Sequence, residues 1–333
     1  MFNAHPLCPT FGPQHLTNFA QVDTACKALQ SKGEHRAALL VAQSGGGGET
    51  ARLLNLQLER WGEVRADQHM EQERVALYSL VAGCPVWSGS GASPVNTCSG
   101  LEWRRALAQH LWYLSHPLAS VGDALHQFAA AWRGEGEHGA YCSAPRPEYC
   151  EGEGEAADLC YLLVRLYTDR STSLEQLLGP ASHTPDPLDY RLSWLLHRVL
   201  ATLGYRHLGA AARDRLTRDS ASQAETCGLW HWAVFVLLHL EEPSARRGAV
   251  LEVLERNAAG LTEEREEWLV QELGLPVQWV AGARATLARA EGRSKERAEC
   301  LLQAERWTEA HTVIVQEIAP DAIIGQEYDY LHR

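Results

Sequence analysis

The most apolar run of the chain occupies residues 227–240 and contains no Asp, Glu, Lys or Arg. Apolar side chains recur there at the three- and four-residue spacing of one helix face, and others cover much of the remaining surface. A helix that is apolar nearly all round is buried on several sides, and this one is shorter than the roughly 20 residues that cross a bilayer. We therefore expect a central helix, ended by Pro243, with Trp230, Trp232 and Phe235 in the core.

Amphipathic patterns predict short helices along most of the rest of the chain. Ser120 fits the N-cap of one of them, because Asp123 follows three residues later. Turns rich in Gly, Pro and Ser separate the helices. The helices are expected over residues 22–29, 36–43, 49–61, 71–81, 101–114, 121–132, 156–167, 174–178, 188–203, 245–257, 262–272, 277–290, 294–304, 307–318 and from 321 onward.

The helix expected over residues 188–203 carries apolar side chains at helical spacing, and we assign it to the core together with Trp194. Its apolar positions are Leu192, Leu195, Leu196, Val199 and Leu203.

Short helices joined by short turns, without a long coiled coil, predict an all-α, solenoid-like stack. We find no convincing strand, and no fixed repeat period emerges. Residues 1–20 are expected to be irregular. Residues 83–97 form a Gly, Ser and Pro loop, and residues 134–155, rich in Gly and Glu, form an acidic surface loop that is expected to be mobile.

Composition narrows the classes of function. The chain has 333 residues, of which 45% are hydrophobic, so it is expected to fold. Its net charge of −12 argues against direct binding to nucleic acid, which takes clustered Lys and Arg. Nine scattered Cys without a repeated short spacing indicate a reducing compartment rather than a disulfide framework. The first 16 residues lack the pattern of a secretory signal, and no run is long enough for membrane insertion.

Side chains that could carry chemistry give weak patterns. His126, His138, Cys142 and Cys150 lie in or near the acidic loop, but only the spacing of His138 and Cys142 approaches that of paired zinc ligands. The glycine run at residues 45–48 is followed by Glu49 and Thr50, where a phosphate-binding loop needs Lys and Ser or Thr. We therefore expect neither a metal nor another cofactor.

Catalysis is not expected either. Cys227 and His231 lie one helical turn apart and could touch, but such a pair in an apolar helix usually serves packing. No Gly-x-Ser-x-Gly elbow occurs. A hydrolase that uses these groups is the alternative from another class of function.

Several long stretches, in one order along the chain, closely resemble the scaffold nucleoporins made as the carboxy-terminal half of the nucleoporin 98-96 precursor. The likeness runs from about Thr24 to the end. The stretches are residues 82–87, 101–105, 110–114, 184–194, 203–208, 228–239, 321–324 and 328–331.

The resemblance implies an ancestral coatomer element, an irregular helical solenoid that folds back on itself. It places residues 21–333 in one solenoid, with an outbound trunk over 21–82, a crown over 83–203, a return trunk over 204–320 and the start of a truncated tail over 321–333. Because residues before Thr24 do not match, the strands that complete a six-bladed propeller partner are expected only in a longer chain.

The resemblance also implies a structural role without enzymatic activity. It predicts a scaffold component of the nuclear pore complex, in the nuclear envelope, that contacts other nucleoporins of the Y-shaped subcomplex and supports mRNA and protein transport. A vesicle-coat subunit of the same helical class is the alternative. Ile324, Tyr328 and Leu331 recur at helical spacing near the end of the chain, and we expect this stripe to be partly uncovered and to form a protein interface.

Overall fold

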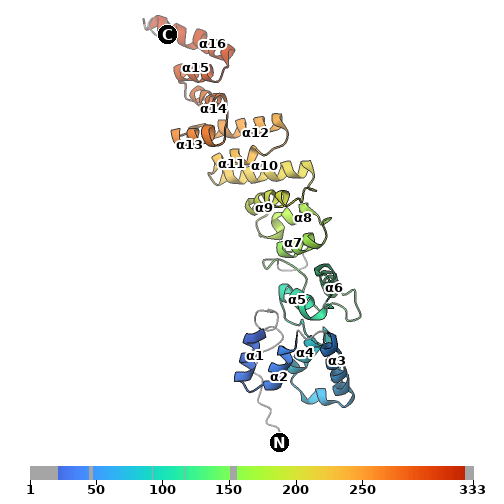
Figure 1. The fold of residues 1–333 in the computed structure, drawn as a ribbon. Helices are drawn as coiled ribbons and strands as arrows, with labels where there is room; N and C mark the ends of the chain where they lie inside the picture. The colour runs from blue at the N-terminus through green and yellow to red at the C-terminus, as the bar shows by residue number, and fades with distance from the viewer. Residues whose placement is uncertain (1–21, 45–47, 92, 117, 151–155, 327–333) are drawn as a thin grey trace. The chain divides into compact units, whose positions relative to one another are not determined.

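The computed structural model describes residues 22–44, 48–91, 93–116, 118–150 and 156–326, and these are overwhelmingly helical (Figure 1). The all-α prediction is confirmed. The chain divides into two compact units, residues 1–172 and residues 173–333, and each is described by itself. The division into trunk, crown and tail stays a prediction.

Unit 1 is built from helices that pair with their neighbours along the chain, such as α1 with α2 and α3 with α4. Leu29, Val41 and Leu80 are fully buried at the contact of α1, α2 and α4, and Phe128 is fully buried in α6. Its elements are α1 (Val22–Ser31), α2 (His35–Ala42), α3 (Gly48–Glu63), η3 (Ala66–His69), α4 (Gln72–Val81), α5 (Trp103–Gln109), the π-helical turn η4 (His110–Leu114), α6 (Val121–Arg133) and α7 (Leu159–Thr168).

The loop expected over residues 83–97 contains a short antiparallel pair of strands, β1 (Val86–Trp87) and β2 (Val95–Asn96). The expectation of no strand is wrong here. Two-residue strands are too short to show an alternating pattern in the sequence, so the pair could be found only from the contacts between its strands.

The start of α6 follows the sequence prediction. The Ser120 hydroxyl accepts a hydrogen bond from the Asp123 amide at 3.2 Å, and the Asp123 carboxylate accepts one from the Ser120 amide at 2.9 Å. This reciprocal capping satisfies backbone donors that have no partner inside the helix. Gly134 ends α6 with a φ of 74°, a left-handed conformation that glycine adopts without steric cost.

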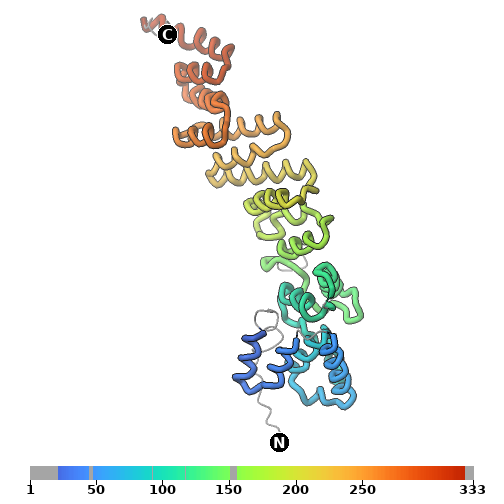
Figure 2. Tube along the Cα trace, in the orientation of Figure 1, coloured from blue at the N-terminus to red at the C-terminus, as the bar shows by residue number. Residues whose placement is uncertain are grey.

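Unit 2 is a succession of helices, most of which pack on a near neighbour in the chain, and Figure 2 traces its path. A cluster that includes Ala285, Leu301 and Val313 is buried among α14, α15 and α16. The elements are α8 (Leu174–Leu178), η5 (Pro180–Ser182), α9 (Arg191–Thr202), α10 (Ala210–Thr226), α11 (Trp230–Leu237), α12 (Pro243–Arg256), η6 (Ala258–Gly260), α13 (Glu263–Glu267), the π-helical turn η7 (Trp268–Glu272), α14 (Val277–Ala290), α15 (Ser294–Gln303), α16 (Trp307–Val313), the π-helical turn η8 (Ile314–Ile318) and α17 (Ala319–Ile324).

The predicted central helix is α11, which packs against α10 and α12. Helix α10 was not predicted, because this long helix is largely polar and shows little amphipathic contrast. Trp230 is 4% exposed, but Trp232 is 48% exposed and Phe235 is only partly buried, so the placement of Trp232 in the core is wrong. In a stack, a helix meets the neighbour before it and the neighbour after it, and one side stays open. Trp232 lies on that side against the ring of Trp268, with 5.3 Å between centroids.

No helix in the described part of the chain is both long and apolar enough to cross a membrane.

Candidate interaction surface

Helix α9 has two faces of different character. Its buried face carries Ser193, Trp194, His197 and Leu200. The Trp194 ring meets the edge of His239 at 5.2 Å between centroids and that of Phe235 at 6.0 Å. Trp194 is therefore a packing residue between α9 and the segment of α11.

The opposite face of α9 is apolar and open. The assignment of Leu192, Leu195, Val199 and Leu203 to the core is wrong, because the wide Trp194 and His197 side chains face the neighbouring helices and these four residues are exposed. Leu196, assigned to the core with them, is partly buried. We call the exposed set the α9 stripe. Its members, with their exposed fractions, are Leu188 at 71%, Leu192 at 44%, Leu195 at 58%, Val199 at 54% and Leu203 at 65%.

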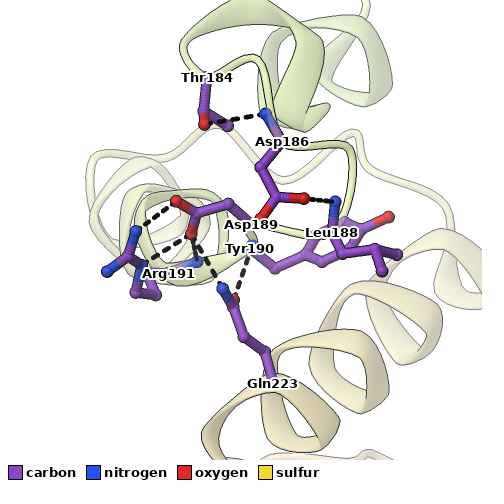
Figure 3. A network of polar contacts seen from close by, with 7 residues as sticks. All are labelled: Thr184, Asp186, Leu188, Asp189, Tyr190, Arg191 and Gln223. Carbon is purple, nitrogen blue, oxygen red and sulfur yellow. Dashed lines mark hydrogen bonds and ion pairs between the residues drawn. The ribbon is translucent and has the colours of Figure 1, made fainter. Parts of the chain in front are cut away.

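A polar network fixes the start of α9 on α10 (Figure 3). The Asp189 carboxylate accepts hydrogen bonds from Nε of Arg191 at 2.8 Å and from Nε2 of Gln223 at 3.1 Å. The same Gln223 side chain accepts a hydrogen bond from the Tyr190 amide at 2.8 Å through its Oε1. One α10 side chain therefore ties down both residues that precede α9.

Electrostatics stabilise the network. The two-point ion pair with Arg191, helped by the Gln223 amide, holds the pKa of Asp189 well below its usual range, although partial burial opposes the shift. The charged carboxylate is therefore the form that the folded state prefers.

The segment before the network presents the first residue of the stripe. The Asp186 carboxylate accepts a hydrogen bond from the Leu188 amide at 2.9 Å, and the Thr184 hydroxyl accepts one from the Asp186 amide at 3.3 Å. Such side chain to backbone bonds shape turns in place of a helix or strand. They hold Leu188 at the end of the stripe, where 71% of it is exposed.

Positive charge borders the stripe. Arg191 and Arg198 are exposed and lie seven residues apart, so they share one edge of α9, beside the apolar face. A partner that covers the stripe would meet apolar side chains along its middle and guanidinium groups along one rim.

Only one residue of the expected terminal stripe, Ile324, lies among the described residues. Ile324 is 82% exposed on α17, while Ala322 is buried. The other two residues of the expected terminal stripe, Tyr328 and Leu331, lie outside the described residues. The terminal interface stays a prediction.

The groups considered for catalysis do not form a pair. Among the hydrogen bonds of the described residues none joins Cys227 to His231. The His231 ring lies instead between aromatic rings, 5.6 Å from Trp268 and 5.9 Å from Trp230 between centroids. Burial and the nearby Arg265 lower its pKa. His231 is therefore placed as a packing residue.

The residues weighed and rejected as zinc ligands do not form a cluster of their own among the described residues. His126 is exposed on α6, and His138 is exposed in the loop that follows. The described residues instead bring Cys142 together with Cys98 and His110. That cluster was missed because its members lie far apart in the sequence.

Comparison with known proteins places these features in a family. Residues 14–287 match the family model described as Nuclear protein 96. The chain is 38% identical over 320 residues to the nuclear pore complex protein Nup98-Nup96 of Drosophila melanogaster. This alignment covers 94% of the chain and 16% of the Drosophila protein. It is 28% identical to Nup98-Nup96 of Caenorhabditis elegans, over 85% of this chain and 16% of that protein. It is 24% identical to NUP96 of Arabidopsis thaliana, over 94% of this chain and 30% of that protein. The chain thus spans less than a third of the length of each of these relatives.

Proposed function

Because the chain belongs to the Nuclear protein 96 family, we propose that it is a structural element of the nuclear pore complex, located at the nuclear envelope. Relatives that match most of the chain carry the names of nuclear pore complex proteins. These names do not favour the alternative of a vesicle-coat subunit. The proposed role is architectural and needs no catalytic group.

The α9 stripe is the feature that supports a contact with another protein. Five apolar side chains at helical spacing, three on α9 with Leu188 before it and Leu203 after it, are each 44% to 71% exposed. Isolated exposed leucines are ordinary, but a contiguous apolar patch of this kind marks a surface that another protein covers. We propose that the stripe docks a helix of another nucleoporin of the Y-shaped subcomplex.

The partner is defined by its chemistry. A helix with apolar residues at i, i+3, i+4 and i+7 would pack along the stripe, as helices do when they meet in a groove. An acidic residue beside that apolar row would face Arg198 at the rim, since Arg191 is already paired with Asp189. The polar network of Asp189 and Gln223 supports this mode, because it holds α9 in place before the partner arrives.

The test replaces two stripe residues in the whole chain, Leu195→Asp and Val199→Asp, and compares nuclear-rim localisation and co-purified nucleoporins with the parent. Both side chains are more than half exposed, so the fold should survive. Two charges at the centre of a docking surface should weaken partner recovery by at least about tenfold, or 1.4 kcal/mol.

Leu302→Asp is the matched control, since Leu302 is 40% exposed on α15, away from α9. It should leave localisation and recovery unchanged. Full recovery of every nucleoporin by the doubly charged stripe variant would refute docking at α9. Absence of the parent chain from the nuclear rim would refute the proposed role itself.

A further inference from the structure

Three side chains with metal-binding chemistry converge in unit 1. Cys98, His110 and Cys142 each offer one ligand atom, and these three atoms all lie within 4.8 Å of one another. Adjacent ligand atoms around a tetrahedral zinc ion, with bonds of 2.0–2.3 Å, are about 3.5–3.8 Å apart. Small side-chain movements would therefore bring the three atoms to zinc-binding distances.

The cluster is sheltered. Cys98 is 2% exposed and His110 is 1% exposed, while Cys142 is partly buried. Buried polar groups are costly unless they are paired, and a metal ion pairs all three at once. Cys142 is the most accessible of the three to solvent.

The imidazole of His110 is already oriented as a ligand. Its Nδ1 lies 2.8 Å from the Ala106 carbonyl oxygen, which can only accept, so Nδ1 carries the proton. The lone pair is then on Nε2, which accepts a hydrogen bond from the Tyr141 hydroxyl at 3.1 Å and would exchange that bond for the ion. A backbone carbonyl that fixes the tautomer in this way is the usual outer-shell partner of a histidine that binds zinc.

The three residues come from segments that are separate in the chain. Cys98 follows β2, His110 opens the π-helical turn η4, and Cys142 lies in the loop after α6.

Hydrogen bonds hold the loop in place without a metal. The Asn96 amide group donates to the Tyr141 carbonyl at 2.9 Å, and the Ser143 hydroxyl donates to the Leu101 carbonyl at 3.1 Å. The Tyr141 amide donates to the Ala131 carbonyl at 3.1 Å. Residues 134–150, expected to be a mobile segment, are thus anchored around Cys142, and the ligands are positioned in advance.

We propose that Cys98, His110 and Cys142 bind one Zn²⁺ ion, with a water molecule as the fourth ligand. Two sulfur atoms and one imidazole nitrogen are a donor set that suits zinc. On binding, each thiol releases its proton to solvent, so the ion with two thiolates and a neutral imidazole has no net charge. The Cys98 thiol gives up its 3.2 Å hydrogen bond to Gln109 Oε1. The ion cross-links the loop after α6 to the segment that follows β2 and to the start of η4.

The experiment uses the full chain, purified with a reductant and then dialysed against zinc and against cobalt. We expect about one equivalent of zinc by elemental analysis, and cobalt should give tetrahedral absorption bands with a charge-transfer band from two thiolates. Cys142→Ser should halve the charge-transfer band and weaken zinc binding by at least about tenfold, since even outer-shell changes cost 10–100-fold. Helix content by circular dichroism shows that the variant is folded.

Cys150→Ser is the matched control, because Cys150 lies in the same loop but outside the cluster. It should bind zinc like the parent. Zinc should also raise the melting temperature of the parent and of Cys150→Ser but not that of Cys142→Ser. Equal zinc binding by the parent and Cys142→Ser would overturn the proposal. A parent chain that, purified with a reductant, still contains a Cys98–Cys142 disulfide and no bound metal would overturn it as well. This outcome is independent of the α9 stripe.

Discussion

Single side chains decide how α9 is held. Gln223 reaches from α10 to bind a carboxylate and a backbone amide of adjacent residues, at 3.1 Å and 2.8 Å. Hydrogen bonds to a charged group are stronger than neutral ones, and the Asp189 carboxylate takes part in several of them. The start of α9 therefore depends on one ionised carboxylate more than on helix propensity.

The first prediction concerns the pH dependence of this carboxylate. Asp189 has a folded-state pKa lowered first by Arg191, so the unfolded chain binds a proton more readily. Its contribution is fully present above the unfolded pKa of about 3.9 and is lost as pH falls toward the folded value. Asp189→Asn should lower the free energy of unfolding at pH 7, and this difference should shrink when denaturant unfolding is repeated near pH 3. A difference that stays constant with pH would contradict the role assigned to the charge.

At the scale of the element, α9 shows that an apolar row and a buried row need not coincide. Leu192, Leu195 and Val199 are exposed, while Trp194, His197 and Leu200 are buried. A tryptophan ring fills more of an interhelical space than a leucine does, and it meets Phe235 and His239 there. The helix is held by its aromatic face and leaves its aliphatic face exposed.

The second prediction compares two adjacent residues of α9. Trp194→Ala should cost about 3–5 kcal/mol of unfolding free energy, because the ring is 6% exposed and packs on α11. Leu195→Ala, at a side chain that is 58% exposed, should change it by no more than about 0.5 kcal/mol. Thermal or denaturant unfolding of both variants measures the contrast. A large loss from Leu195→Ala would show that the stripe is core after all.

At the scale of the whole molecule, the excess of acidic residues argues against nucleic acid as a partner. Acidic residues outnumber Lys and Arg by 42 to 30, which gives the net charge of −12. A protein binds nucleic acid more tightly when its Lys and Arg neutralise phosphates and release counterions. The net negative charge of this chain repels the phosphates instead. Contacts made by helix faces suit the chain better than contacts to nucleic acid.

The third prediction follows from that charge. The full chain should not retard DNA or RNA fragments in an electrophoretic assay near 0.15 M salt, at chain concentrations that saturate ordinary nonspecific binders at about 10⁻⁴–10⁻⁶ M. Lowering the salt should produce no steep gain in affinity, since few phosphates are neutralised. Retardation that strengthens sharply at low salt would reveal a basic surface that the net charge hides.

The sequence by itself determined the all-helical class, most helix positions and the family likeness. These follow from local properties, namely the period of apolar residues, the Ser120 cap and the glycine and proline turns. Helix α14 illustrates the point, since its observed range, Val277–Ala290, agrees with the expected one. The polar helix α10 was not predicted, because it shows little contrast between an apolar and a polar face.

The tertiary structure alone decided which faces are covered and which side chains meet. Periodicity gives the angle between residues around one helix, but it does not say which angle faces a neighbour. For this reason Trp232 and the α9 stripe were assigned to the core and proved exposed. The convergence of Cys98, His110 and Cys142 depends in the same way on loops that close across 12 and 32 residues, and no local spacing encodes such contacts.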